Sequence, residues 1–96
     1  MCKVGNEAMA LLVKAIVAIE SEEECKRFLE DIMTKKEMMD MAQRLLVAKM
    51  LSEQAVYTKI ATETGASTAT ISRVKRCCDY GEGGYDSILS KIKEEA

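Results

Sequence analysis

The side chains that could do chemistry in this chain of 96 residues gather between residues 57 and 78. There, small polar residues and two arginines recur at helical spacing. On a protruding helix, such residues suit the major groove of DNA, where they can meet base edges and phosphates. The residues expected to meet DNA from this helix are Ser67, Thr68, Ala69, Ser72, Arg73 and Arg76.

The basic residues of this segment predict two kinds of DNA contact. Lys59 and Lys75 are expected to bind phosphates, which fix the register of a protein on DNA without reading its sequence. Arg73 or Arg76 is expected to pair with a guanine edge or with phosphate. The sequence does not choose between these two roles.

The spacing of apolar residues around one glycine predicts a helix-turn-helix motif over about residues 57–78. A tight turn between crossing helices needs a residue tolerant of positive φ, which Gly65 supplies. Ile60, Ile71 and Val74 are expected to fill the wedge between the two helices.

Two further positions bear on this motif. Ser67 can cap the second helix, because its hydroxyl can accept a hydrogen bond from an unpaired backbone amide. Thr64 stands directly before the glycine, where such motifs commonly carry an apolar residue. An ordinary corner between two packed helices is the alternative interpretation.

The net charge of −2 is distributed unevenly along the chain. Residues 57–78 carry four basic residues and one acidic residue, whereas residues 20–31 carry six acidic residues and two basic ones. Local charge decides phosphate contact, so the motif can bind DNA despite the negative total. The low total predicts modest non-specific affinity and a strong dependence on salt.

The composition predicts one all-α domain spanning residues 1–96, because proline is absent and apolar residues recur at helical spacing. Six helices are expected. The first covers about residues 4–19, the second opens with the capping-box pair Ser21 and Glu24, and the third covers about 35–51. The motif supplies two more, and the last covers about 85–94. The glycines at 81–84 are interpreted as a turn, since no Lys-Ser/Thr pair follows as in a phosphate-binding loop.

The first and third helices are too apolar for a single small chain. The first is apolar nearly all round, and such a helix must be buried nearly all round. The third has a wide apolar arc rich in methionine, which at helical spacing is interpreted as core instead of an adaptable ligand surface. Both features predict a partner chain.

The four cysteines have neither the spacing of a disulfide framework nor a histidine to complete a zinc site. Cys2, Cys25, Cys77 and Cys78 are therefore expected to be free thiols in a reducing compartment, with no metal bound. No serine or cysteine has an evident base, and the acidic residues lie in a charge run. An enzyme is therefore not expected.

No leader sequence is recognisable at the beginning of the chain. The longest apolar stretch, residues 8–19, is interrupted by Lys14 and is too short to cross a bilayer. A soluble cytoplasmic protein is expected.

Three segments of the chain resemble the Trp repressor superfamily, and in particular its YerC/YecD family. They are AQRLLVAKML (42–51), ETGASTATISRVKRC (63–77) and YGEGGY (80–85). The resemblance extends over nearly everything from Phe28 to the C-terminus. It implies a six-helix all-α subunit, an obligate homodimer with interlocked N-terminal helices, and recognition of operator DNA.

The resemblance also implies where a small-molecule effector would bind. By position, Thr34, Arg44 and Arg73 match residues that surround tryptophan in the repressor family. Val74 stands where the family has a glycine that makes room for the ligand, and Cys77 replaces a polar contact residue. Because the two methyl groups of a valine cannot rotate away cheaply in a helix, we expect no tryptophan binding. A different effector near Arg44 and Arg73 stays an alternative.

Two functions are compatible with these features. The first is a transcriptional regulator, most simply a repressor, that binds a palindromic operator as a homodimer. The alternative is a helix-turn-helix module that docks onto another protein through the acidic residues 20–31 and does not bind DNA. Salt-sensitive DNA binding distinguishes the two.

Overall fold

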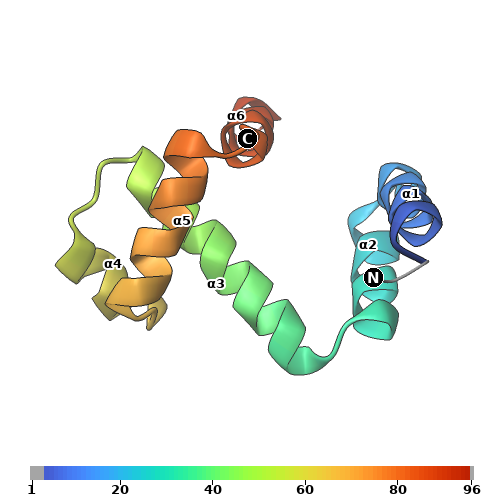
Figure 1. Cartoon of the computed structure of the whole chain (residues 1–96), viewed down its shortest axis with the longest axis horizontal. Helices are drawn as coiled ribbons and strands as arrows, with labels where there is room; N and C mark the ends of the chain where they lie inside the picture. Colours follow the sequence, from blue (N-terminus) through green and yellow to red (C-terminus); the bar gives the residue numbers. More distant parts are fainter. Residues whose placement is uncertain (1–3, 96) are drawn as a thin grey trace. The chain divides into compact units, whose positions relative to one another are not determined.

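The computed structural model describes residues 4–95, which form six helices joined by short connections (Figure 1). The helices are α1 (Val4–Val17), α2 (Glu22–Ile32), α3 (Lys35–Ser52), α4 (Tyr57–Thr64), α5 (Thr68–Tyr80) and α6 (Gly84–Glu95). The described part of the chain contains no strand, so the predicted all-α class is confirmed. The chain divides into two compact units, one ending at Lys35 and the other beginning at Lys36.

Helix α1 ends two residues earlier than predicted, at Val17 instead of residue 19. The reason lies in its last turn, where the amides of Ala18 and Ile19 donate to carbonyls three residues back, those of Ala15 and Ile16. This tightening is typical of a helix end.

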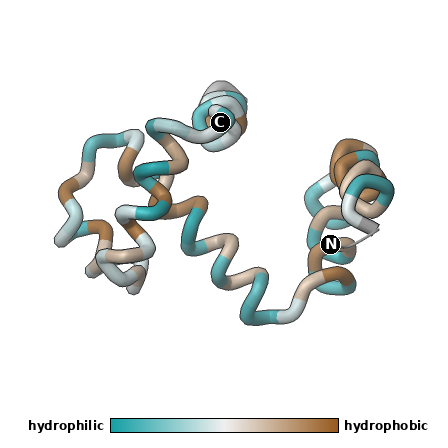
Figure 2. Tube along the Cα trace, in the orientation of Figure 1, coloured by the Kyte–Doolittle hydropathy of each residue, from teal (hydrophilic) through white to brown (hydrophobic). Residues whose placement is uncertain are grey.

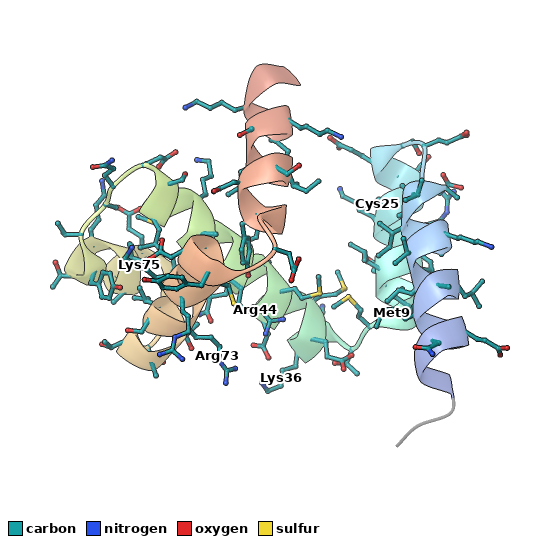
Figure 3. All side chains as sticks on the ribbon, turned by 45° about the horizontal axis from the view of Figure 1, so that its top comes forward. Met9, Cys25, Lys36, Arg44, Arg73 and Lys75 are labelled. Atoms are coloured by element: carbon teal, nitrogen blue, oxygen red, sulfur yellow. The ribbon has the colours of Figure 1, made fainter. Side chains whose placement is uncertain are left out.

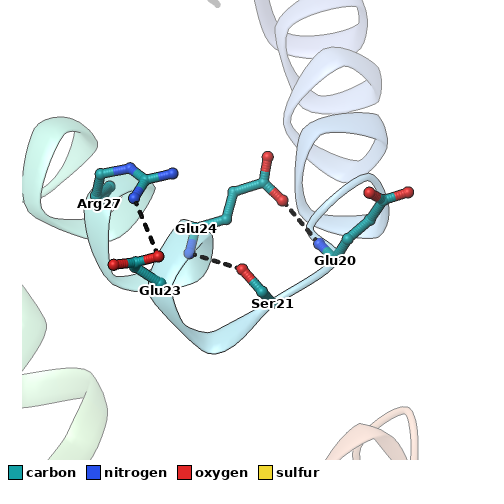
Figure 4. Close-up of polar contacts among 5 residues, drawn as sticks. All are labelled: Glu20, Ser21, Glu23, Glu24 and Arg27. Carbon is teal, nitrogen blue, oxygen red and sulfur yellow. Dashed lines mark hydrogen bonds and ion pairs between the residues drawn. The ribbon is translucent and has the colours of Figure 1, made fainter.

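Helix α2 begins with the predicted pairing of Ser21 and Glu24 (Figure 4). The Glu24 amide donates to Ser21 Oγ at 3.1 Å, and Glu24 Oε1 accepts from the Glu20 amide at 2.8 Å. In a capping box the second side chain usually accepts from the backbone amide of the cap residue itself. Here the Glu24 carboxylate accepts instead from the amide of Glu20, the residue before the cap. On the solvent side, Arg27 forms an exposed ion pair with Glu23 at 3.7 Å.

The apolar surface of α1 is not covered within the first unit. Hydrophobic residues run along most of this helix (Figure 2). Leu11 is 69% exposed and Val17 is 77% exposed. Leu12, Ala15 and Ile19 are half-buried.

The core of the second unit lies where α3, α4 and α5 meet. It consists of Val47, Ala48, Met50, Ile60, Ala66, Ile71 and Val74. Tyr85 and Leu89 of α6 pack against it and are half-buried. This core fixes the helix-turn-helix to the C-terminal half of α3.

The remaining apolar residues of α3 are exposed in the single chain. Of the methionines predicted to be core, Met50 is buried, whereas Met39 is 67% exposed and Met41 is 50% exposed. Leu45 and Leu46, with Leu89 and Ile92 of α6, line an apolar groove of about 600 Å³.

Candidate nucleic-acid interface

The turn between α4 and α5 has the geometry that the sequence predicts. Gly65 ends α4 in the left-handed region with φ 75°, and its amide donates to the Ala61 carbonyl at 2.9 Å. Ser67 caps α5, since its Oγ accepts from the Thr70 amide at 3.1 Å. Both ends of the turn are therefore satisfied by local hydrogen bonds.

Thr64, the polar residue where an apolar one is usual, forms a small hydrogen-bond network. Its Oγ1 donates to the Ile60 carbonyl at 2.7 Å and accepts from the Ala66 amide at 3.1 Å. Its carbonyl oxygen accepts from Gln43 Nε2 of α3 at 3.0 Å. The departure from the usual pattern thus exchanges an apolar contact for hydrogen bonds and keeps the turn ordered.

The wedge beneath the turn is buried as predicted. Ile60 and Ile71 are 0% exposed, and Val74 is 1% exposed. Ile71 and Val74 lie on one face of α5, and through this face the helix packs closely against the core. The opposite face of α5 points to solvent.

All eight residues predicted to meet DNA are exposed. They are Lys59 on α4, Ser67 at the start of α5, and Thr68, Ala69, Ser72, Arg73, Lys75 and Arg76 along α5. The structure thus brings small polar side chains and two arginines together on the exposed side of one helix. Figure 3 labels Arg73 and Lys75 among them.

The basic residues of this surface differ in whether they form an ion pair. Lys75 Nζ lies 3.0 Å from Asp79 Oδ2, and this hydrogen bond, with the charge of the carboxylate, raises the pKa of Lys75. Within residues 4–95, Lys59, Arg73 and Arg76 take part in no ion pair. These three side chains are therefore the ones available to an anion such as phosphate.

The five residues that the resemblance assigns to an effector site differ in their unit of the chain and in their exposure. Thr34 precedes α3 and belongs to the first unit, whereas the other four lie in the second. Arg44, Arg73 and Cys77 are exposed, and Figure 3 labels both arginines. Val74 faces the core.

A hollow of about 540 Å³ lies beside Cys77, bounded by α3, α5 and α6. Its lining is Leu45, Cys77, Gly81, Glu82, Gly84, Tyr85 and Ile88. Burial raises the pKa of Tyr85, while the positive charge of Arg44 acts in the opposite direction. Arg44 is therefore an electrostatic neighbour of this hollow, and Val74 is not among its lining residues.

Three of the four cysteines can be assigned. Cys25, Cys77 and Cys78 are free thiols, and Cys2 lies outside the described residues. Within residues 4–95 no cluster of side chains could hold a metal ion, and no helix is long and apolar enough to cross a membrane.

Comparison with known proteins decides the family. The sequence profile described as Trp repressor protein matches residues 7–93. The chain belongs to the Trp repressor family. It is 49% identical over 92 residues to the YerC protein of Bacillus subtilis (strain 168), with 96% of this chain and 88% of YerC covered. The predicted resemblance is thereby confirmed.

Solved structures of the Trp repressor family agree with the fold described above. A TrpR-like protein from Eubacterium eligens ATCC 27750 superposes with a TM-score of 0.89 and 43% identity, covering 95% of this chain and 94% of that one. A candidate Trp repressor from Staphylococcus aureus gives a TM-score of 0.88 and 40% identity, covering 97% and 96%. Membership places the chain among Trp repressor-like regulators.

One structural feature of the motif was missed by sequence reasoning. The Gln43–Thr64 bond could not be foreseen from Gln43, although a polar Thr64 at an apolar position was a signal that hydrogen bonds replace packing there. Tyr85 was predicted to lie on the buried side of the last helix; it packs against the core and also lines the hollow beside Cys77.

Proposed function

We propose that the chain is a sequence-specific transcriptional regulator, most simply a repressor, that binds a palindromic operator as a homodimer. The observation that carries this proposal is the two-faced character of α5. Ile71 and Val74 are at most 1% exposed, while Thr68, Ser72 and Arg73 lie on the solvent side. A helix held by one face can present the other to base edges in a major groove.

The pairing of the cations supports a division of roles. Arg73 and Arg76, which have no ion pair within residues 4–95, suit a guanine edge or a phosphate. Lys59 on the neighbouring helix suits a phosphate. Lys75 is shared with Asp79, so its contribution to DNA binding is the weaker of the two lysines.

The exposed apolar residues of α1 and α3 support a second copy of the chain. Leu11, Val17 and Met39 are each at least 67% exposed in the single chain. Exposed apolar surface of this kind marks interaction sites in soluble proteins. A two-fold dimer would carry two copies of α5 into successive major grooves about 34 Å apart, which requires a palindromic site.

The burial of Val74 supports the proposal that the protein binds DNA without tryptophan. This side chain is 1% exposed and belongs to the core, in the place where the family has a glycine that makes room for the ligand. From this match to the family pattern we infer that its methyl groups occupy the space that an indole would need. A different effector would have to bind near Arg44 and Arg73.

Selection of bound duplexes from a random DNA library, with purified protein and no ligand, tests the proposal. We expect enrichment of a palindrome with half-sites about one helical turn apart. The double variant Arg73→Ala/Arg76→Ala should lose the enrichment, whereas Lys91→Ala, an exposed position on α6, should keep it. Enrichment that appears only after tryptophan is added contradicts ligand independence. No enrichment in either condition contradicts ligand-independent DNA binding and leaves two alternatives, a different effector near Arg44 and Arg73 or the protein-docking module.

A further inference from the structure

One hydrogen bond ties the helix-turn-helix directly to the long helix α3. Gln43 Nε2 donates to the Thr64 carbonyl oxygen at 3.0 Å, across 21 positions in the sequence. The ion pairs Lys36–Asp40, Lys49–Glu53 and Lys75–Asp79 each join residues four apart. The Gln43 bond therefore constrains tertiary orientation, which bonds within one helix cannot do.

Gln43 supplies the end of α4 with a hydrogen bond that the helix itself lacks. The last carbonyls of any helix lack partners within the helix. Here the Ala61 carbonyl accepts from the Gly65 amide at 2.9 Å, and the Ile60 carbonyl accepts from Thr64 Oγ1 at 2.7 Å. The Thr64 carbonyl is left for Gln43, whose Nε2 would lie 3.9 Å from a Cβ placed on Gly65. The amide group thus rests against the turn itself.

We propose that Gln43 is a positioning residue, which fixes the angle of the helix-turn-helix on α3 and thereby sets the spacing of the two reading helices. The inference rests on the proposed function, since it concerns how the dimer meets its operator. Apolar packing by Ile60 and Ile71 is non-directional, whereas a hydrogen bond weakens steeply when its angle changes. The bond therefore selects one orientation among those that the core would accept.

The position of Gln43 on α3 connects this angle to the dimer. The same helix exposes Met39, Met41 and Leu45, which belong to the apolar surface proposed for the second copy. An angle fixed relative to α3 is then fixed relative to the two-fold axis. In a regulator that works without a bound ligand, this orientation has to come from the protein alone.

The variant Gln43→Leu tests the proposal, because leucine has a similar size and no donor. The measurement is the affinity for the selected operator, for the same half-sites moved apart by one base pair, and for an unrelated duplex. Loss of one hydrogen bond in each of two subunits predicts that preference for the native spacing falls by about five- to 150-fold. Affinity for the unrelated duplex should not change.

Two control variants separate positioning from stability. Gln54→Leu alters the chain's other glutamine, which is exposed in the connection before α4. Leu89→Ala truncates a half-buried residue of α6 and lowers the melting temperature without touching the Gln43 bond. Both controls should keep the spacing preference. An unchanged preference in a folded Gln43→Leu variant overturns the inference.

Amide hydrogen exchange gives a second readout that requires no DNA. The Gly65 and Ala66 amides donate within the turn, and Ala66 is 5% exposed. In Gln43→Leu these amides should exchange at least several-fold faster, while amides in the middle of α6 should not change. If the wild-type protein binds no DNA, the proposed function fails, and the exchange result alone decides whether Gln43 holds the turn.

Discussion

Lys75 Nζ lies 3.0 Å from Asp79 Oδ2, one turn further along the helix that carries the proposed DNA contacts. The hydrogen bond and the carboxylate charge raise the pKa of Lys75. Because the pair is on the surface, its effect on stability is small. Its main consequence is electrostatic, since it shields a positive charge that would otherwise face phosphate.

The substitution Asp79→Asn should therefore strengthen non-specific DNA binding and steepen its salt dependence by up to about one counterion per subunit. A lysine with a raised pKa keeps its charge at neutral pH and loses it only as pH rises through the raised value. The effect should thus be equal in mildly acidic and mildly alkaline buffer. Fluorescence anisotropy over a salt series measures it. An equal gain in Asp40→Asn, which releases Lys36 on α3, would assign the effect to net charge alone.

Replacement of Lys59 by alanine should weaken binding to all duplexes alike. The side chain is exposed on α4 and has no ion pair within residues 4–95, as suits a phosphate contact. The salt slope should fall by about one per subunit. Titrations against the operator and a scrambled duplex test this, with Lys91→Ala as the control. A loss confined to the operator would contradict a phosphate role.

Val74→Gly should create the space that tryptophan needs, at a cost in stability. Val74 is 1% exposed, so its removal leaves a cavity and places a glycine inside α5. Together these effects lower the free energy of unfolding by about 2–4 kcal/mol. Ligand binding to the folded state alone raises the melting temperature, so added tryptophan should stabilise the variant and not the wild type. Stabilisation of the wild type by tryptophan would refute the filled-pocket interpretation.

The parts of this fold that local chemistry dictates were predictable from the sequence. Gly65 adopts positive φ and Ser67 caps α5, because each role is set by residues within one turn. Ile60, Ile71 and Val74 are buried because their spacing puts them on the facing sides of two helices. The predicted helix α1 was two residues too long, because the periodicity of apolar residues does not reveal that the last turn is tightened.

The parts that depend on tertiary placement were not predictable. The Gln43–Thr64 bond joins residues 21 apart, and nothing in the neighbourhood of Gln43 points to Thr64. The proximity of Arg44 to Tyr85 likewise arises from the packing of α6 on the core. Lys75 and Asp79 have the i,i+4 spacing of a helical ion pair, so that contact could have been foreseen. The choice between base and phosphate for Arg73 depends on the DNA partner.

Thr64→Val should destabilise the motif even though the two side chains are nearly equal in size. The change removes the acceptor of the Ala66 amide, which is 5% exposed and has little access to water. An unpaired buried donor costs about 1–3 kcal/mol. Urea denaturation measures the difference. Thr62→Val, at an exposed position of the same helix, should change stability by less than about 0.5 kcal/mol, and equal losses in both variants would contradict the network.

Cys77 should react with alkylating reagents before its neighbour Cys78. Cys77 is exposed, whereas Cys78 is half-buried and packs against the core. Burial, with the nearby carboxylates of Asp86 and Asp79, raises the pKa of the Cys78 thiol. Because the thiolate is the nucleophile, Cys78 has less of the reactive form at any pH below that raised value. Tandem mass spectrometry after brief iodoacetamide treatment distinguishes the two positions. In Cys77→Ser, Cys78 should stay slow in the folded protein and become fast in urea; rapid labelling of Cys78 without denaturant would show that its surroundings open.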